Sequence, residues 1–460
     1  MNTQLELLRR LPVKGYETDI WGHQEYTGWM DEQMSWKTSC CLGDWSWLTE
    51  VLIKGPDAKK FLSGITVNNM ENLAIGQAKH AIQCNQDGKI VVEGILMRLG
   101  EEEFVYIATA IIYWDIYQLK KGHYHATAEV IDWTNFQVSG PKALYLVEKI
   151  AGESLRDVEF MHFKKIKVAG VEVYALRQGM AGEIGFEILA PLEHYQKVYD
   201  AIWAAGQEYG LRRLGGRTAM INHLEACFPS ITIDYLPAVF GDDTKEFRDE
   251  VLAFSGQELA SFSEIVTNAG SRGTSYTLGL NLKKLLNIYR VGGSYDPAEI
   301  SGYYRSPVDF GWARNIKFDH EFIGRQALEK EVAEAKKKIV TLVWNSDDIA
   351  DVNNSLYKKG EMYDYMEMPR NNKWITWVDK VMKDGKIIGV TTNRGYSVYF
   401  REMLSHCPID VEYSNPGTEV TIIWGNPGKP QKEIRAKVAK SPYKQDNRRA
   451  DLKALPASLK

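Results

Sequence analysis

Apolar and polar positions in the first third of the chain predict short strands that alternate with helices. Thr49-Glu-Val-Leu-Ile53 has the composition of a strand, and Gly55-Pro-Asp-Ala58 then begins a helix. Residues 77–83 and 89–99 read as two strands that flank Asn85-Gln-Asp-Gly88, a turn sequence typical of a hairpin. The pattern therefore predicts an α+β region.

Residues 136–228 repeat this scheme. Ser139-Gly-Pro-Lys-Ala143 matches Ile53-Lys-Gly-Pro-Asp-Ala58, which is a weak internal repeat of a strand followed by a helix. Two related halves that face each other would leave a cleft between them. Residues 241–300 are polar and irregular, and we interpret them as an insertion that covers or frames the cleft.

The last third predicts more strands, at 338–344, 386–392 and 418–424. A helix begins within Phe318–Leu328, before the first of these strands. After Tyr443 the sequence is charged, and we expect a mobile tail.

Composition limits the class of protein. A chain of 460 residues with 44% apolar and 25% charged residues is long enough for two or three domains. A net charge of -4 and the absence of a basic, aromatic-rich stretch argue against nucleic acid as a partner. No run of about 18 apolar residues and no cleavable leader are visible, so we expect no membrane association and a cytoplasmic location.

The cysteines do not indicate a disulfide framework or a metal site. There are five, without paired spacing, and we interpret them as reduced and mostly packed thiols. Cys227 could act as a nucleophile, but its helix-like, apolar surroundings favour an inert thiol. His123 and His125 are typical of surface strand residues, so we expect no metal site.

The segment Arg177-Gln-Gly-Met-Ala-Gly-Glu-Ile-Gly-Phe-Glu-Ile188 carries the clearest candidate chemistry. Its three glycines permit tight turns or a close approach of the backbone to a ligand. Glu187 alternates with Phe186 and Ile188, so its side chain should point away from them into a cleft or solvent. A tight turn followed by an exposed strand explains the residues equally well.

Together with Ser139–Leu146 and Gly215–Ala226, this segment resembles the folate-binding aminomethyltransferases, the T-protein of the glycine cleavage system and its relatives. The resemblance implies a multi-domain α+β fold with a C-terminal β-barrel domain, and tetrahydrofolate as cofactor. It also implies that Glu187 receives the pterin ring. Arg217 would bind the glutamate tail of the folate or pair with a carboxylate such as Glu225.

Other positions depart from the T-protein pattern. A tyrosine of the family is Met180 here, the arginine of its L-R-L-E helix is His223, and Glu183 has at most a turn-capping role. Only Glu93 stands where T-proteins carry a pair of aspartates, and we place it among the cofactor-binding candidates. A single glutamate, with a side chain one methylene longer than that of aspartate, argues against an amine substrate. Proton transfer to or from an amine requires a closely placed carboxylate.

A finer resemblance is to the tetrahydrofolate-dependent aryl O-demethylases, which remove the methyl group of methoxylated aromatic acids such as vanillate and syringate. It rests on Trp29–Lys37, Gly43–Ser46, Ser306–Trp312 and Phe318–Gly324. It implies a small methoxylated aromatic substrate, with 5-methyltetrahydrofolate and a phenol as products.

The resemblance also implies the residues that act on the substrate. It places a functional tyrosine shortly after the L-E helix, at Tyr235, where a phenolic hydroxyl could supply a proton to the ether oxygen. Tyr26 and Trp29 are candidate substrate-binding residues, and Trp45 and Trp47 could extend the same aromatic wall. Core packing is an equally good interpretation of each.

The implied domains are an N-terminal segment (1–37), a folate-binding region (38–305, with the insertion 241–300), a β-barrel domain (306–445) and a charged tail (446–460). Alternative functions remain open at this stage: a folate-dependent demethylase of a small sulfonium or amine compound, an aminomethyltransferase, or a non-catalytic folate-binding protein.

Overall fold

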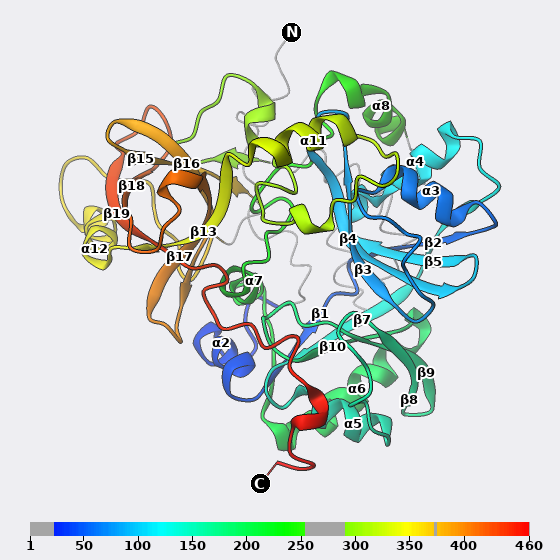
Figure 1. Ribbon diagram of the computed structural model, residues 1–460. Coiled ribbons are helices and arrows are strands. Elements are labelled where there is room, and N and C mark those ends of the chain that lie inside the picture. Colours follow the sequence, from blue (N-terminus) through cyan, green and yellow to red (C-terminus); the bar gives the residue numbers. More distant parts are fainter. Residues whose placement is uncertain (1–22, 254–289, 372–374, 460) are drawn as a thin grey trace.

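Three sheets surround the short central helix α7 (Ile221–Ala226) in the computed structural model, which describes residues 23–253, 290–371 and 375–459 (Figure 1). The predicted multi-domain α+β architecture with a closed C-terminal barrel is confirmed. Most of the predicted insertion, residues 254–289, lies outside the described residues, as does 1–22 of the N-terminal segment.

The first sheet has five antiparallel strands in the order β3-β4-β5-β2-β6. Helices α3 and α4 cover one face, because the apolar residues of α3 recur at Ala58, Phe61, Leu62 and Ile65 and form one helical stripe. The predicted hairpin turn is present, with the Asn85 side chain accepting from the backbone of Asp87 and Lys89. The elements are β2 (Thr49–Lys54), α3 (Ala58–Ile65), β3 (Ala78–Cys84), β4 (Ile90–Gly100), β5 (Glu103–Ala108), α4 (Tyr113–Lys121) and β6 (Thr127–Ile131).

The second sheet has six strands in the order β11-β1-β7-β10-β9-β8, with α5 and α6 on its outer face. Its inner face packs on the first sheet through a small apolar cluster that includes Leu52 and Ile95 from one sheet and Leu176 and Leu189 from the other. The elements are β1 (Cys40–Asp44), β7 (Trp133–Ser139), α5 (Ala143–Ala151), β8 (Phe163–Val168), β9 (Val171–Arg177), β10 (Gly185–Pro191), α6 (Tyr195–Gly206) and β11 (Leu211–Arg213).

The backbone of the two halves supports the internal repeat. Gly55 and Gly140 have φ of +126° and +136°, and the helix that follows each begins three residues later. At both positions an added Cβ would lie 2.5–2.6 Å from a backbone carbonyl oxygen of a neighbouring segment, that of His125 or of Ser39. Glycine is therefore required twice, for the same close approach of two chain segments.

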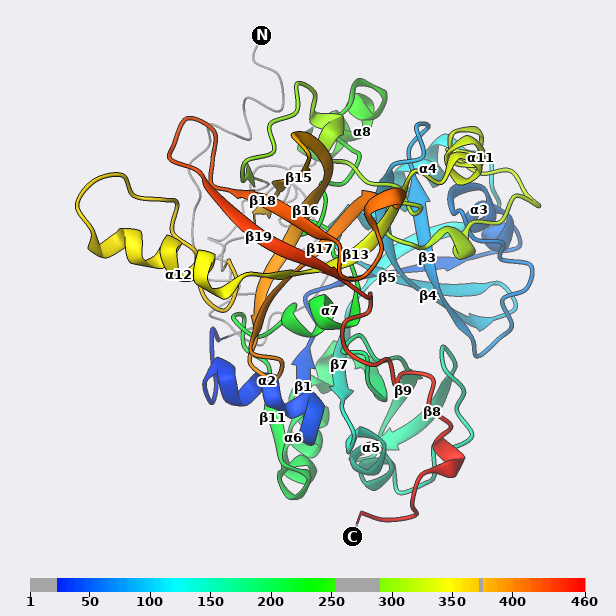
Figure 2. The same ribbon diagram turned by 60° about the vertical axis from the view of Figure 1, so that its left-hand side comes forward.

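The C-terminal barrel closes in the order β13-β17-β16-β15-β18-β19, and an apolar core fills it. The strands predicted near 338–344, 386–392 and 418–424 are β13, β16 and β18. Helix α11 (Arg325–Glu334) precedes the barrel and α12 (Ser346–Asn354) lies beside it (Figure 2). The strands are β13 (Lys337–Trp344), β15 (Asp379–Lys383), β16 (Lys386–Ser397), β17 (Glu402–Asp410), β18 (Glu419–Trp424) and β19 (Lys432–Ala439).

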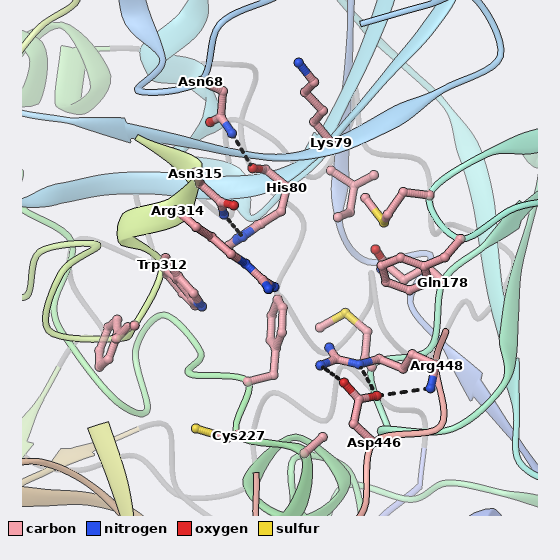
Figure 3. A pocket seen from close by; sticks show the side chains of 18 of the residues that line it. Asn68, Lys79, His80, Gln178, Cys227, Trp312, Arg314, Asn315, Asp446 and Arg448 are labelled. Carbon is pink, nitrogen blue, oxygen red and sulfur yellow. Dashed lines mark hydrogen bonds and ion pairs between the residues drawn. The ribbon is translucent and has the colours of Figure 1, made fainter. Parts of the chain in front are cut away.

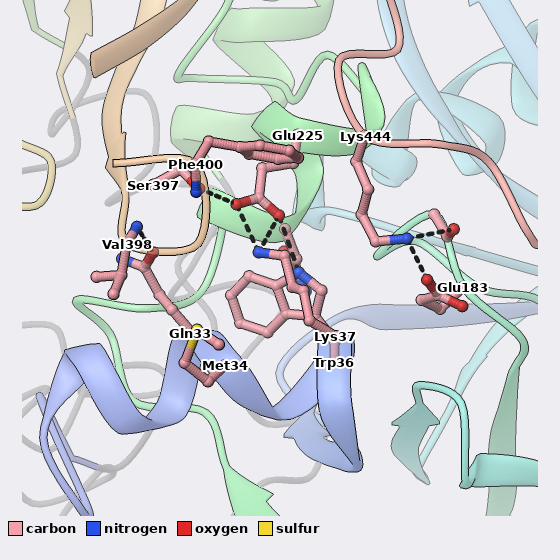
Figure 4. Close-up of polar contacts among 12 residues, drawn as sticks. Gln33, Met34, Trp36, Lys37, Glu183, Glu225, Ser397, Val398, Phe400 and Lys444 are labelled. Atoms are coloured by element: carbon pink, nitrogen blue, oxygen red, sulfur yellow. Dashed lines mark hydrogen bonds and ion pairs between the residues drawn. The ribbon is translucent and has the colours of Figure 1, made fainter. Parts of the chain in front are cut away.

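Glu225 of α7 joins the N-terminal helix to the barrel (Figure 4). Its fully buried carboxylate accepts from the Trp36 indole at 3.0 Å and the Lys37 ammonium at 2.6 Å, both on α2 (Trp29–Thr38). Ser397, at the end of barrel strand β16, donates to the same carboxylate at 2.6 Å. The N-terminal helix, the central helix and the barrel therefore meet at one side chain.

The segment after Tyr443 is packed, contrary to the expectation of a mobile tail. It runs from the barrel across to the second sheet (Figures 1 and 2), where Leu452 joins the core at 1% exposure. Arg177 donates to the backbone carbonyls of Arg448 and Ala450, and Lys444 pairs with Glu183. Composition alone could not predict this, because long-range contacts of Leu452 and Leu455, of backbone carbonyls and of Lys444 hold the segment.

The remaining helix α8 (Lys245–Ala253) lies beside the first sheet, and β12 (Val291–Gly292) pairs with β14 (Thr376–Trp377) near the barrel. None of the helices in the described ranges is long and apolar enough to cross a membrane.

Substitution of Gly140 tests the close approach of the Gly140 and Ser39 segments. Gly140→Ala should lower the free energy of unfolding by about 2 kcal/mol or more beyond the effect of Gly360→Ala, because the new methyl group would overlap Ser39. Gly360 is a matched control, since its φ is +117° and an added Cβ there meets nothing within 4 Å. Urea unfolding measures both, and equal losses would show that the contact with Ser39 can relax.

Candidate functional site

Glu187 lies in β10 on the face that meets the first sheet. Phe186 and Ile188 point to the other face, into the core beneath α5 and α6, so the predicted alternation is confirmed. Strand β7 runs beside β10 with Gln137 opposite Glu187. Because side chains alternate along strands, Asn135 and Gln137 share the face of Glu187.

The surroundings of Glu187 are polar, and none of the described residues forms an ion pair with it. The carboxylate is 5% exposed and accepts from the amide of Gln178 at 2.7 Å and that of Asn135 at 3.4 Å. Burial raises the pKa of Glu187 to about 7, against the smaller opposing effect of these amides. The amide of Gln137 opposes the shift as well, while the buried side-chain oxygens of Asn135 and Gln137 have no hydrogen-bond partner in the described part of the chain. Unsatisfied buried acceptors beside a carboxylate fit a ligand that presents several hydrogen-bond donors.

Glu93 lies on the facing sheet, two residues before Ile95 of the apolar cluster between the sheets. Its carboxylate contacts His80 Nε2 of the neighbouring strand at 2.8 Å. The ring of His80 in turn packs edge-on against Trp312, with 4.7 Å between centroids, and Asn315 lies 3.3 Å from its Nδ1. Glu93 is thus held by a histidine instead of being open to solvent.

One cavity lies between the surroundings of Glu187 and those of Glu93 (Figure 3). It has a volume of about 720 Å³, and both His80 and Gln178 line it. The carboxylates of Glu93 and Glu187 therefore lie directly behind two opposing wall residues. Met180, Phe228 and Trp312 supply apolar wall between them. A volume of this size suits a small organic ligand.

Tyr235 is fully buried, and its ring packs 5.3 Å from that of Phe310, which lines the cavity. The preceding residue, Asp234, anchors this segment, because its carboxylate contacts His406 at 2.9 Å and Thr392 at 2.7 Å in the barrel. The backbone amide of Ser230 donates to the same side chain at 2.8 Å. Tyr235 is therefore on a rigid turn between the central helix and the barrel.

Arg217, Tyr26 and Trp29 form a separate group near the N-terminal helix. Arg217 pairs with Glu25 and donates to the backbone carbonyl of Met368, so its carboxylate partner is not Glu225. Its guanidinium lies 6.0 Å from the Trp29 ring, and the Arg213 guanidinium lies 4.1 Å from the ring of Tyr26. None of the three lines the cavity between His80 and Gln178, and their functional roles remain predictions.

His223, where the resemblance predicts an arginine, lies within a buried aromatic stack. Its ring is parallel to that of Trp45, with 5.2 Å between centroids, and its Nδ1 lies 3.0 Å from the hydroxyl of Ser230. Burial lowers the pKa of His223 to about 3, so the ring is neutral at physiological pH. His223 therefore cannot supply the positive charge of the arginine.

The thiols give no sign of reactivity. Cys227 lines the cavity, but burial raises its pKa to about 12, which keeps it protonated. Within the described ranges, no group of three or more His, Cys, Asp or Glu side chains is arranged to hold a metal ion.

The sequence did not single out His80, Gln137 or Gln178. Gln178 adjoins Arg177 in the glycine-rich segment, so its position could have been noted. The roles of Gln137 and His80 depend on the register of β7 with β10 and of β3 with β4. No local pattern predicts a pairing across fifty residues, such as that of Gln137 with Glu187.

Substitution of Glu187 tests the effect of its buried charge on stability. The pKa is raised in the folded protein, so ionisation opposes folding, and this cost grows as pH rises from the ordinary carboxyl range to above 7. Glu187→Gln should therefore raise the free energy of unfolding at pH 8 by up to about 3 kcal/mol and change it little at pH 5. Urea unfolding at the two pH values measures this.

Glu183→Gln is the matched control. Glu183 is also 5% exposed but pairs with the buried Lys444, so its neutralisation should destabilise the protein at both pH values. A loss of stability at pH 8 in Glu187→Gln would contradict the interpretation of Glu187 as a carboxylate without a countercharge.

Comparison with known proteins gives consistent matches along the chain. Residues 11–240 match the GCVT N-terminal domain family. The syringate O-demethylase of Sphingobium sp. (strain NBRC 103272 / SYK-6) is 33% identical over 91% of this chain and 89% of its own. The sesamin methylene transferase of Sinomonas sp. (strain No.22) is 32% identical over 88% of this chain and 86% of its own.

A solved structure supports the fold. The glycine cleavage system aminomethyltransferase T from Bartonella henselae superposes with a TM-score of 0.63, at 17% identity, over 92% of this chain and 91% of that one. The family model matches half of the chain and the relatives align along most of it, which confirms the predicted resemblance: the chain belongs to the GCVT family of tetrahydrofolate-dependent transferases.

Proposed function

We propose that this protein is an O-demethylase that moves the methyl group of a methoxylated aromatic compound, similar to vanillate or syringate, to N5 of tetrahydrofolate. One observation carries the proposal: the buried carboxylate of Glu187, with the unsatisfied amide oxygens of Asn135 and Gln137 beside it, in a chain 33% identical to a syringate O-demethylase along most of its length. The products are 5-methyltetrahydrofolate and a phenol.

The donor set fits a pterin. A pterin ring presents an amino group and ring N–H donors on one edge, and a carboxylate accepts two of these together. Gln137 and Asn135 offer further amide groups on the same face of the sheet. Glu93, held by His80 on the opposite sheet, is the second acid that we assign to the cofactor.

Bound tetrahydrofolate supplies a nucleophilic nitrogen that accepts the methyl group. The residues of the chain must then handle the leaving group, because cleavage of the O–CH₃ bond leaves a phenoxide that needs a proton. We assign this proton transfer to Tyr235, because its side chain is itself a phenol, like the product formed. Its rigid anchor through Asp234 supports the role, since proton transfer requires fixed geometry.

A second candidate function is methylene transfer from a methylenedioxy-substituted aromatic compound. The relative named sesamin methylene transferase favours it, at 32% identity and similar coverage. Both functions place an aromatic ether beside the folate. The compound that gives up its one-carbon group therefore distinguishes them.

A donor panel tests these proposals. The purified protein is incubated with tetrahydrofolate and vanillate, syringate, guaiacol, sesamin, a dimethylsulfonio acid, or glycine with a lipoyl carrier protein, and the folate products are followed by mass. We expect methyltetrahydrofolate from a methoxylated aromatic compound. Methylenetetrahydrofolate from sesamin would favour the second function, and folate binding without any product would favour a binding protein.

Tyr235→Phe should lower kcat for demethylation by about 100-fold or more and leave the affinity for tetrahydrofolate unchanged. Tyr303→Phe is the control, because Tyr303 is also buried but donates to the backbone carbonyl of Tyr295. Single-turnover assays and equilibrium binding separate the two effects. Unchanged kcat in Tyr235→Phe would exclude Tyr235 as the proton donor.

The affinity for tetrahydrofolate should depend on the charge of Glu187. Only the ionised carboxylate accepts two donors, so affinity should fall about 10-fold from pH 8 to pH 6, below its pKa of about 7. In Glu187→Gln the affinity should be about 10-fold to 100-fold weaker at pH 8 and nearly independent of pH. A variant that keeps the affinity of the unchanged protein would place the pterin elsewhere.

A further inference from the structure

A second, smaller cavity lies where the barrel meets the turn after α7. Its volume is about 30 Å³, and it shares no lining residue with the cavity between His80 and Gln178. Ile233 of the turn, Trp377 of β14 and Trp424 of β18 supply apolar wall. The polar lining consists of Arg370, Asn371, Asn393 and Arg394. A cavity of this volume holds a group about as large as two water molecules, which excludes an aromatic ring or a pterin.

The two arginines of this cavity form no ion pair with a carboxylate of the described residues. Arg394 donates to the backbone carbonyl of Glu367 at 2.8 Å and to the sulfur of Met403 at 3.3 Å. Arg370 donates to the backbone carbonyl of Gly216 at 3.4 Å. A guanidinium has five N–H donors, so most of these donors have no acceptor in the described part of the chain. Burial lowers the pKa of both arginines to about 10, so they stay charged at neutral pH.

A bulge in β16 brings two neighbouring side chains to this cavity. The register between β16 and β17 shifts between Thr392 and Gly395. In a regular strand Asn393 and Arg394 would point to opposite faces, but both line the cavity, at 5% and 9% exposure. The amide oxygen and nitrogen of Asn393 have no hydrogen-bond partner among the described residues, and its φ is +47°. A strained, buried and unpartnered amide beside two cations is typical of a ligand site.

Three carboxylates act on these arginines only from beyond ion-pair distance: Asp234, Glu367 and Asp379. Asp234 is held by the barrel contacts described above. Asp379 accepts from the Trp377 indole and from the backbone amide of Ser294, both at 2.8 Å. Burial raises the pKa of Asp379 to about 7, which weakens its negative charge at neutral pH. The positive charge of Arg370 also lowers the pKa of Arg394, so the two cations repel each other.

We propose that this cavity binds one small monovalent anion, of the size of chloride or formate, between the guanidinium groups of Arg370 and Arg394 and the amide of Asn393. The anion accepts hydrogen bonds from both arginines and offsets their repulsion. Arg370 lies before β14 and the other two residues lie in the bulge of β16, and a single backbone bridge between Arg370 and Gly395 joins these segments. The bound anion therefore holds Arg370 against the barrel, beside the turn that carries Tyr235.

Thermal unfolding in different anions tests the site. At constant ionic strength, chloride or formate replaces gluconate, which is too large for the cavity. The midpoint Tm should rise by about 2 °C or more and then saturate, as expected for a ligand that binds only the folded protein. Arg370→Gln removes one cation and should abolish this dependence. Absence of a saturable increase in the unchanged protein, or the same increase in Arg370→Gln, would overturn the proposal.

Arg435→Gln is the matched control, because Arg435 is an exposed barrel arginine that pairs with Asp348 and does not line the cavity. It should keep the full dependence on the anion. Crystals soaked in bromide give a second measurement that needs no variant. Anomalous scattering should place one bromide between Arg370 and Arg394. A map without a peak there at saturating bromide would overturn the site, even if Arg370→Gln fails to fold.

Discussion

Three segments that are far apart in the sequence are held together by one buried carboxylate. Glu225 accepts from Trp36 and Lys37 of the N-terminal helix and from Ser397 of the barrel. Burial lowers the pKa of Lys37, which shows how fully this ion pair is removed from water. A buried pair stabilises little relative to apolar packing, but the loss of one partner leaves an uncompensated charge that costs about 3–5 kcal/mol. The positions of the N-terminal helix and the barrel around α7 therefore tolerate few alternatives.

The same constraint positions the site. Helix α7 carries Glu225 on one side and His223 within the aromatic stack, and the turn after it places Tyr235. Asp234 is a second buried carboxylate that connects separate segments, because it joins that turn to His406 and Thr392 of the barrel. The candidate catalytic residue thus depends on polar contacts between domains, while the core of each domain is apolar.

The sequence predicted what local patterns determine. The alternation of apolar and polar residues in β10 correctly predicted that Glu187 points away from Phe186 and Ile188. The turn sequence Asn85–Gly88 correctly predicted the first hairpin. The family resemblance predicted the closed barrel. The sequence could not predict long-range contacts, because the pairing of Arg217 with Glu25 depends on where residues 23–25 lie against the loop at 215–217. The charged composition of the C-terminal segment likewise suggested a mobile tail, since nothing local shows that Leu452 enters a core.

The raised pKa of Glu187 has a consequence for protein turnover. A carboxylate buried without a countercharge makes the ligand-free fold less stable than its apolar cores would allow, and a ligand that donates to this carboxylate restores the difference. The population of unfolded chains, which proteases remove, then varies inversely with ligand supply. The steady-state abundance of this protein would follow the availability of its cofactor, without any dedicated regulatory element.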